Sequence, residues 1–437
     1  MKNKKSRYVI NTFSDDEKSN IFFNLKNGVG IKVDKNISKN FKSLSENPTM
    51  NRLFSKYDFY SSEGEVEKVW DDYKNSFQDK FFHLIILPHE NCNFRCVYCY
   101  ERFENNKMEL DIEKGIMNFV ETKLKENNFS HLVVSWFGGE PLLAVDVIER
   151  LSEKFITLCN ELDVTYFSHI TTNGYNLTPK NFEILTKSKV SSYQITIDGV
   201  KETHDKQRKL IGGQSTYDRI IDNLILMSKT NVNFEVHLRM NVGMSNIKYV
   251  DDFIDNMKLL FGNDPRYSLY FYNIKKWGGD NDSNLDICPD NLALTLAERT
   301  INREMRSIPI KTMLQRNNSC YASSPNSFVL GVDGTVYKCT IALYEDYNKV
   351  GHINKDGEMI LDDEKLKLWV SRGIEDSGCK SCFFAPSCHG DSCPLVRIQT
   401  SKRPCPQPKK DIKDVIRVMD KQGHTFIEIK QNKKVKA

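Results

Sequence analysis

Between residues 81 and 310 the sequence alternates short β-branched and aromatic runs with longer amphipathic stretches. The short runs have the length and composition of buried strands, and the longer stretches, such as residues 111–127 and 144–162, have the period of helices. A repeated strand-then-helix order predicts a parallel sheet, because each helix returns the chain to the same edge. Six such units predict an α/β fold, a partial (β/α)6 barrel like a TIM barrel, with strands at 82–88, 132–138, 167–173, 193–199, 234–242 and 267–274.

Two further regions flank the predicted barrel, which is placed at residues 81–310. Residues 1–80 contain an extended segment at Tyr8–Phe13 and then a hairpin pattern whose turn is Asn27-Gly28. Helical stretches follow near 37–56 and 65–77, so this region is predicted to be a small α+β domain. Its sheet edge can accept a peptide as an added strand, although a stabilising cap on the barrel is the alternative. Residues 311–437 are loop-rich and cysteine-rich, end in a C-terminal tail and are predicted to depend on metal for their fold.

Composition excludes several classes of protein. Hydrophobic residues make up 39% and charged residues 27% of the 437 positions, as in soluble globular proteins. The net charge of +4 gives no argument for nucleic acid. No apolar run approaches the roughly 20 residues that a membrane helix needs, and no apolar run follows the basic N-terminus as in a secretory signal. We therefore expect a cytoplasmic protein with neither a nucleic-acid nor a membrane partner.

The twelve cysteines are clustered, with three at 92–99 and seven between 320 and 405. In a reducing cytosol, clustered cysteines bind metal more often than they form disulfides. Cys92, Cys96 and Cys99 have the spacing C-x3-C-x2-C directly after the first predicted strand. Three thiolates on one loop can hold three irons of a [4Fe–4S] cube and leave the fourth iron open. A zinc knuckle or unrelated buried thiols are the alternatives.

The first cluster and the segments after it resemble the signature of the radical S-adenosylmethionine (SAM) superfamily. Phe137–Pro141 resembles the family's GGEP motif, whose backbone meets the SAM amino group, and Ile197–Arg208 resembles its DG…HD..R stretch. The resemblance implies that Arg208 pairs with the SAM carboxylate and that Tyr98 contacts adenine. The cofactor-binding residues that it implies are Tyr98, Gly138, Gly139, Glu140, Pro141, Thr172, Asn173, Asp198, Arg208, Arg239 and Asn241.

Taken singly, these motifs are weak, because Gly-Gly and Asn-Gly pairs are most often plain turns and a lone arginine is usually on the surface. Their order makes them specific. Each falls at the C-terminal end of a successive predicted strand, where barrel active sites form. The sequence therefore predicts one SAM site at that end of the barrel.

The later cysteines resemble the SPASM extension of radical SAM proteins, which carries two auxiliary [4Fe–4S] clusters. The resemblance implies that one cluster is held by Cys379, Cys382, Cys388 and Cys405, and the other by Cys320, Cys339 and Cys393. Where relatives have C-x3-C, this chain has C-x4-C, from Cys388 to Cys393. The second set lacks a fourth cysteine close by, so we expect an iron open to a substrate thiolate. Cys288 is a distant candidate for that ligand, but it and Cys159 are better read as buried free thiols.

The resemblance implies an enzyme in which the reduced cluster passes an electron to bound SAM. SAM then yields a 5′-deoxyadenosyl radical, which removes a hydrogen atom from the substrate. SPASM proteins mostly modify peptides. Anaerobic sulfatase-maturing enzymes, which make formylglycine, carry Asp after the cysteine of G-x4-C, whereas Thr340 stands here. A threonine hydroxyl cannot act as a base near pH 7. The general base stays unassigned among Glu140, Asp198 and Asp391.

We therefore predict a maturase that installs a crosslink, most simply a thioether, in a ribosomally made precursor peptide. Residues 1–80 would bind the leader peptide, and a flavodoxin or ferredoxin would supply electrons. Formylglycine formation is the alternative within the same superfamily. An iron–sulfur electron carrier without SAM chemistry is the alternative of another class.

Overall fold

The fold is described from a computed structural model, which places residues 4–37, 40–75, 80–288, 292–314, 319–370 and 373–430. The chain forms two compact units. We name them the barrel unit (Phe77–Ile308 and Ser324–Val370) and the flanking unit (Met1–Ser76, Pro309–Ser323 and Ser371–Ala437). The boundary expected near 310 therefore differs from the observed division, because the C-terminal region is shared between the two units. The tail at 431–437 lies outside the described residues.

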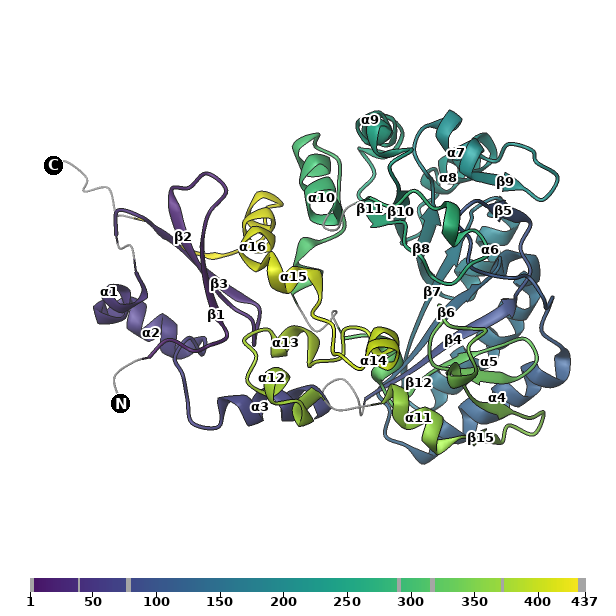
Figure 1. The fold of residues 1–437 in the computed structure, drawn as a ribbon, viewed down its shortest axis with the longest axis horizontal. Helices are drawn as coiled ribbons and strands as arrows, with labels where there is room; N and C mark the ends of the chain where they lie inside the picture. Colours follow the sequence, from purple (N-terminus) through teal and green to yellow (C-terminus); the bar gives the residue numbers. More distant parts are fainter. Residues whose placement is uncertain are drawn as a thin grey trace. The chain divides into compact units, whose positions relative to one another are not determined.

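The barrel unit is built on one sheet with the strand order β11-β10-β8-β7-β6-β4-β12-β13-β14-β15 (Figure 1). The first six strands in this order are parallel to their neighbours. In the described residues the sheet ends at β11 and at β15, so the barrel is open. The predicted partial barrel is confirmed, with β4 (Phe81–His89), β6 (His131–Gly138), β7 (Thr165–Thr172), β8 (Val190–Thr196), β10 (Glu235–Val242) and β11 (Tyr267–Asn273).

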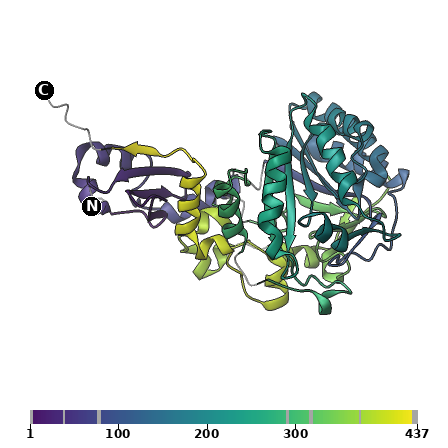
Figure 2. The same cartoon turned by 90° about the horizontal axis from the view of Figure 1, so that it is seen from above.

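Amphipathic helices cover the outer side of these strands (Figures 1 and 2). In α5 (Val145–Glu161), Val147, Leu151, Phe155 and Leu158 are buried at helical spacing, and the helix packs on β4 and β7. Because the helices cover the outer side of the strands, the C-terminal ends of the strands remain available for a functional site. The other helices are α4 (Leu110–Glu126), α6 (Pro179–Lys187), α7 (Lys201–Gln207), α8 (Tyr217–Ser228), α9 (Val250–Phe261) and α10 (Leu292–Asn302).

An antiparallel extension continues the barrel sheet beyond β4. Its first strand, β12, runs parallel to β4 with Ser327 opposite His83, and the next three strands are antiparallel. Residues 324–370 therefore belong to the barrel unit. The elements are β12 (Ser327–Leu330), β13 (Thr335–Tyr337), β14 (Lys349–Ile353), β15 (Met359–Leu361) and α11 (Asp363–Trp369).

A second sheet, with the order β1-β2-β3-β16, forms part of the flanking unit. The predicted hairpin is present, and Gly28 has the positive φ (71°) that its turn requires. The helical stretch expected near 37–56 is two helices, because Pro48 starts a new one that Asn47 caps. The elements are β1 (Val9–Phe13), β2 (Ser19–Asn24), β3 (Val29–Asp34), α1 (Phe41–Glu46), α2 (Pro48–Lys56), α3 (Glu65–Tyr73) and β16 (Ile427–Ile429).

The cysteine-rich part of the flanking unit is made of short helices and loops. Its helices are α12 (Ser377–Lys380), α13 (Ala385–Cys388), α14 (Pro394–Thr400), α15 (Gln407–Lys410) and α16 (Ile412–Lys421). The extra residue of the C-x4-C spacing is absorbed in a turn where His389 and Gly390 both have positive φ, and the His389 ring stacks on Tyr73 (3.7 Å between centroids). Short 3-10 helices complete both units: η2 (Pro141–Ala144), η3 (Ile247–Tyr249), η4 (Asp282–Asn284), η5 (Ile310–Met313), η6 (Tyr321–Ser323), η7 (Asp346–Asn348) and η8 (Gly373–Glu375).

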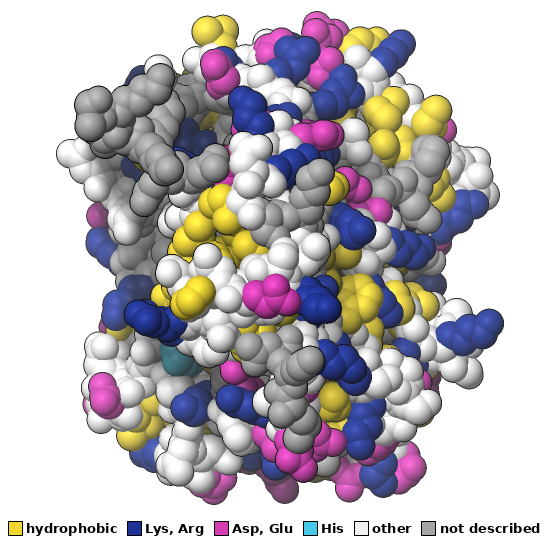
Figure 3. Space-filling view, turned by 90° about the vertical axis from the view of Figure 1, so that its left-hand side faces the viewer, with side chains coloured by type: hydrophobic (Ala, Val, Ile, Leu, Met, Phe, Trp, Pro, Cys, Tyr) yellow, Lys and Arg dark blue, Asp and Glu magenta, His cyan; other side chains and the backbone are white. Residues whose placement is uncertain are grey.

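The described helices include none that is both long and apolar enough to cross a membrane. On the face that Figure 3 displays, Lys and Arg side chains are interspersed with acidic, hydrophobic and other side chains. This mixture agrees with the small net charge of the sequence.

Candidate active site

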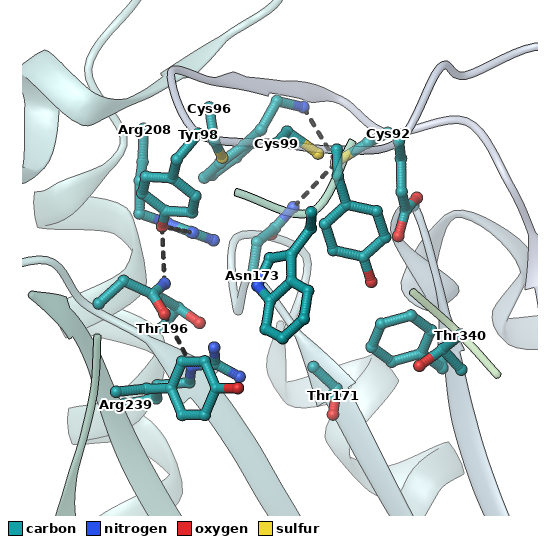
Figure 4. A pocket seen from close by; sticks show the side chains of 18 of the residues that line it. Cys92, Cys96, Tyr98, Cys99, Thr171, Asn173, Thr196, Arg208, Arg239 and Thr340 are labelled. Carbon is teal, nitrogen blue, oxygen red and sulfur yellow. Dashed lines mark hydrogen bonds between the residues drawn. The ribbon is translucent and has the colours of Figure 1, made fainter. Parts of the chain in front are cut away.

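The loop after β4 carries Cys92, Cys96 and Cys99 at the C-terminal end of the barrel strands. A two-stranded pair fixes it, in which β5 (Phe94–Cys96) is antiparallel to β9 (Arg208–Leu210) and Cys96 lies opposite Arg208. All three thiols line one cavity of about 320 Å³, which we call the barrel cavity (Figure 4). Burial raises the pKa of each thiol, so metal binding there must displace protons.

The three cysteines of this loop suit an iron–sulfur cluster. Among the described residues, no three His, Cys, Asp or Glu side chains are grouped so that they could hold one metal ion. A [4Fe–4S] cube instead takes one thiolate on each of several irons, which suits three cysteines spread along one loop.

Two glycines let the loop after β6 approach the cysteine loop. A Cβ on Gly138 would lie 2.5 Å from the His89 carbonyl oxygen, and one on Gly139 would lie 2.5 Å from the carbonyl oxygen of Asn91. The Gly139 N–H donates to His89 and the Glu140 N–H donates to Asn91, each at 3.1 Å. Only glycine permits this contact, so the GGEP segment shapes the cysteine loop.

Glu140 is fully buried behind the cavity. Its carboxylate accepts hydrogen bonds from the Thr172 hydroxyl (2.6 Å), the Asn173 N–H (2.7 Å) and the Leu142 N–H (3.0 Å). Burial raises its pKa, and these hydrogen bonds oppose the rise. Glu140 therefore ties the end of β7 to η2, which starts at the buried Pro141.

Asn173 connects the same strand end to the cysteine loop. Its side-chain N–H donates to Asn93 Oδ1 (2.8 Å) and lies 3.8 Å from Cys92 Sγ. The Phe94 N–H also points at Cys92 Sγ (3.3 Å). Donors aimed at a thiolate stabilise its charge, as they do around cluster ligands.

A buried network surrounds the Tyr98 hydroxyl. It donates to Asp198, and it accepts from Arg208 Nη1 (2.6 Å) and Asn241 Nδ2 (2.9 Å). The Asn241 N–H donates to the second oxygen of Asp198 (2.8 Å), and Arg239 Nε donates to Asn241 Oδ1 (2.8 Å). Burial raises the pKa of Tyr98 well above its usual value, so the phenol remains a donor. The network holds Arg208 and Arg239 on one side of the cavity (Figure 4).

Most of the residues expected at the site are brought together. The predicted residues that line the barrel cavity are Cys92, Cys96, Tyr98, Cys99, Gly138, Gly139, Thr172, Asn173, Arg208, Arg239 and Asn241. Three expected SAM contacts, Glu140, Pro141 and Asp198, are not among the residues that line it. The side chains of Glu140 and Asp198 are wholly buried and accept hydrogen bonds from neighbouring residues.

Sequence reasoning missed other residues of the cavity wall. Gln194, Thr196, Tyr272 and Lys275 line it, on or directly after β8 and β11, so the expectation that active sites form at the C-terminal ends of barrel strands could have pointed to them. Glu101 lines it too, and burial, together with Glu90 and Glu140, raises its pKa to about 8. The remaining residues missed are Phe94, Tyr100, Phe103, Phe137, Thr171, Asn273, Ile274, Trp277 and Ile341. Thr340, singled out in the sequence, lies in the wall (Figure 4).

A second cavity, within the flanking unit, is lined by Cys379, Cys382, Cys388 and Cys405. We call it the flanking cavity, and its volume is about 530 Å³. Its wall also contains the cations Arg397, Lys402, Arg403 and Lys409 and the carboxylate Asp376. Lys409 Nζ donates to Cys405 Sγ (3.2 Å), and Gly390 packs so closely that a Cβ there would lie 3.1 Å from Cys379 Sγ. Four thiols beside four cations suit a closed, negatively charged iron–sulfur cluster.

The remaining cysteines are divided between the units. Cys320 and Cys393 belong to the flanking unit and Cys339 to the barrel unit, so their grouping stays a prediction. In the flanking unit the Cys320 N–H donates to the Asp391 carbonyl (2.8 Å). Cys159 and Cys288 are buried free thiols, as expected.

Residues 86–257 match the family described as the Radical SAM superfamily. One curated relative is a cysteine-type anaerobic sulfatase-maturating enzyme of Clostridium novyi, 25% identical over 330 residues that cover 71% of this chain and 87% of the relative. Another is the radical SAM cyclopropyl synthase TigE of Paramaledivibacter caminithermalis, 22% identical over 52% of this chain and 54% of the relative.

Solved structures show the same fold. Native anSMEcpe with bound AdoMet and a Kp18Cys peptide is 21% identical, with a TM-score of 0.56, over 77% of this chain and 96% of that one. Streptococcus suis SuiB bound to S-adenosylmethionine is 15% identical, with a TM-score of 0.51, over 92% of this chain and 97% of that one. The second likeness includes most of the chain, so it extends beyond the barrel.

Proposed function

Since this chain carries a radical SAM domain and is an enzyme of that superfamily, we propose that it is a maturase that crosslinks a ribosomally made precursor peptide. The observation that carries the proposal is the barrel cavity, where the three-cysteine loop faces side chains from five strands, β6, β7, β8, β10 and β11. Radical SAM enzymes of the sulfatase-maturase and peptide-maturase kinds are the relatives that this chain resembles.

Cys92, Cys96 and Cys99 would hold a [4Fe–4S] cluster, and that cluster with bound SAM supplies the 5′-deoxyadenosyl radical that removes a substrate hydrogen atom. Arg208 donates to the Tyr98 hydroxyl (2.6 Å) and would supply the cation for the SAM carboxylate. Gly138 and Gly139 give the SAM amino group access to backbone. Tyr100, Phe103 and Trp277 line the cavity and limit the entry of water, which protects a radical from side reactions.

The substrate would occupy the part of the cavity away from the cysteines. Gln194, Thr196, Arg239 and Tyr272 offer amide, hydroxyl and cationic groups there. Arg239 also lies over the Tyr272 ring at 4.3 Å, which fixes the direction of both side chains. Such a wall suits a peptide backbone and its polar side chains.

Thr340 favours crosslinking over formylglycine formation. Its hydroxyl lies in the cavity wall but cannot take a proton near neutral pH. In a crosslinking reaction, one hydrogen atom leaves the substrate carbon, a proton leaves the cysteine thiol, and the electron left over passes to an acceptor as the C–S bond forms. The product is lighter by two hydrogens. The thioether assignment rests on the open iron that the sequence predicts for one auxiliary cluster.

Cys379, Cys382, Cys388 and Cys405 would hold the auxiliary cluster of the flanking unit and accept that electron. A flavodoxin or ferredoxin would reduce the first cluster. Residues 1–80 would bind the leader peptide, in line with the sheet and its edges.

Formylglycine formation stays a second candidate, because the Clostridium novyi relative is a sulfatase-maturating enzyme. The test uses the anaerobically reconstituted enzyme, dithionite and SAM, with chromatography for 5′-deoxyadenosine. Incubation with a cysteine-rich peptide encoded beside the gene should lower the peptide mass by two hydrogens. Conversion of cysteine to formylglycine in a sulfatase peptide would support the second candidate. If no 5′-deoxyadenosine forms, the protein is an iron–sulfur carrier instead.

A further inference from the structure

The three N-terminal strands of the flanking unit form a sheet whose outer strands are β1 and β3, and the chain covers only the β3 side, with the C-terminal strand β16. On β1, the Lys5 ammonium donates to the Val9 carbonyl (2.9 Å), which places a charge on that edge. On β3, the chain's own C-terminal strand β16 is added, parallel, with Ile427 opposite Ile31 and Ile429 opposite Val33. A lysine on an edge discourages the addition of another strand. The pairing of β16 with β3 shows that the β3 side can accept an extended segment.

The added strand fits through its apolar side chains. Ile427 and Ile429 pack against the core cluster that contains Ile31, Val33 and Phe54. On the other face of the sheet, Phe426 lies over Gly30, where a Cβ would come within 2.3 Å of its ring. Glu428 between them is exposed. The edge therefore selects a segment with apolar side chains two positions apart and places no demand on the residue between them.

The segment can leave without taking its neighbours with it. The preceding helix α16 is held independently, by Lys32 to Asp420 (2.7 Å), Arg417 to Asp15 (2.9 Å) and its own buried face. Gly423 follows the helix with a positive φ (81°) and an open surrounding. Only three residues pair with β3, and strands of that length contribute few ladder hydrogen bonds.

We infer that β16 is a built-in occupant of the docking edge for the precursor peptide, and that an extended apolar segment of that peptide replaces it on β3. The inference rests on the proposed function, because it needs a peptide substrate. It goes beyond that function by naming β3 as the strand that the peptide pairs with and by predicting apolar peptide side chains two positions apart. It also names β16 as the segment that the peptide displaces. The free enzyme is thereby protected from edge-to-edge association until a peptide displaces the strand.

The test uses the full-length, reconstituted enzyme and a fluorescein-labelled synthetic peptide that copies residues 422–430. In Ile427→Lys/Ile429→Lys the charged side chains expel β16 from the core, so the probe should bind at least tenfold more tightly than to the wild type. Glu428→Lys is the matched control, because it changes the charge by the same amount at an exposed position and should bind like the wild type. A probe carrying both lysines should bind none of the three. Fluorescence anisotropy gives each affinity.

Equal probe affinity for all three proteins, with circular dichroism unchanged, would overturn the inference. If the double variant fails to fold, amide hydrogen exchange in the wild type decides. Residues 424–430 should exchange faster than β2, and protection equal to that of β2 would refute a displaceable strand. The assay needs no SAM, so it is separable from the proposed function. Probe binding without any 5′-deoxyadenosine formation refutes the enzyme, and SAM cleavage without probe binding refutes only the docking edge.

Discussion

The two cysteine-lined cavities differ in what holds their cysteines in place. In the barrel unit, three cysteines lie on one loop that parallel strands, the β5–β9 pair and the GGEP segment support. In the flanking unit, four cysteines are spread over α12, the segment between α12 and α13, α13 itself and the loop before α15. The first set has a scaffold of its own, and three cysteines would leave one iron of a cluster open. The four cysteines of the second set would close a cluster, and that cluster would stabilise the short helices around it. We therefore expect a catalytic role for the first set and a structural and electron-accepting role for the second.

The largest expected effect comes from removing one cysteine of each set. Cys96→Ala should lose about four irons per chain and all 5′-deoxyadenosine formation, because no other thiol of the loop can replace it. Cys379→Ala should lose a similar amount of iron yet retain SAM cleavage without completed peptide product. Iron analysis and chromatography measure both. Loss of SAM cleavage in Cys379→Ala would show that the two cavities are not separate in function.

Removal of all iron should affect the two cavities unequally. After chelation, amide exchange in residues 377–410 should rise on the order of tenfold or more, because short helices around a lost cluster have little core of their own. Residues 131–138 of β6 should stay protected. Mass spectrometry of exchanged peptides gives both rates. Equal rises in the two regions would mean that the barrel also depends on metal for its fold.

Gly139→Ala probes the scaffold of the first set. Its Cβ would lie within 2.6 Å of the carbonyl oxygens of Asn91 and Glu90, which are backbone and cannot turn aside. A displacement of the loops by even an ångström can cost about 100-fold, so SAM affinity should fall by that order. Equilibrium dialysis measures the affinity. Gly212→Ala is the control, because its added methyl meets only the flexible end of Gln214.

Much of this scaffold was predictable from the sequence, because its motifs lie next to the predicted strands along the chain. Cys92, Gly139 and Asn173 each follow a strand, and the carboxyl ends of neighbouring parallel strands lie at one edge of the sheet. The roles of Glu140 and Asp198 were not predictable. Their contact with SAM stays a prediction, whereas the structure shows that the buried carboxylate of Glu140 accepts a hydrogen bond from Thr172 and that of Asp198 accepts one from Tyr98.

The pairing of strands that lie far apart in the sequence could not be predicted either. The β12 strand joins β4 across more than two hundred residues, and β16 joins β3 from the other end of the chain. Short strands carry weak sequence signals, and their partners depend on the whole fold. The predicted boundary at 311 therefore treated as one region what the structure divides into two units.

Lys409→Met probes the electronic role of the second set. Lys409 donates to Cys405 Sγ at 3.2 Å, and a cation beside a cluster ligand favours the reduced, more negative state. Loss of that cation should lower the reduction potential of the cluster by on the order of tens of millivolts. Redox titration monitored by electron paramagnetic resonance measures it. Lys413→Met removes an exposed lysine that does not line the flanking cavity and should leave the potential unchanged.

The smallest expected effect belongs to Thr340→Val, and it distinguishes the two candidate reactions. The change keeps the shape of the side chain and removes a hydroxyl that cannot act as a base. Loss of a general base typically costs roughly 10²–10⁴-fold, whereas we expect turnover of the peptide to fall by less than about threefold. The rate of peptide mass loss, compared with 5′-deoxyadenosine formation in the same reaction, measures the effect. A hundredfold fall in peptide turnover with unchanged SAM cleavage would place Thr340 in the proton-transfer step and remove its argument for crosslinking. A small change would instead show that Thr340 takes no part in proton transfer, as we expect for a crosslinking enzyme whose thiol proton passes to another group.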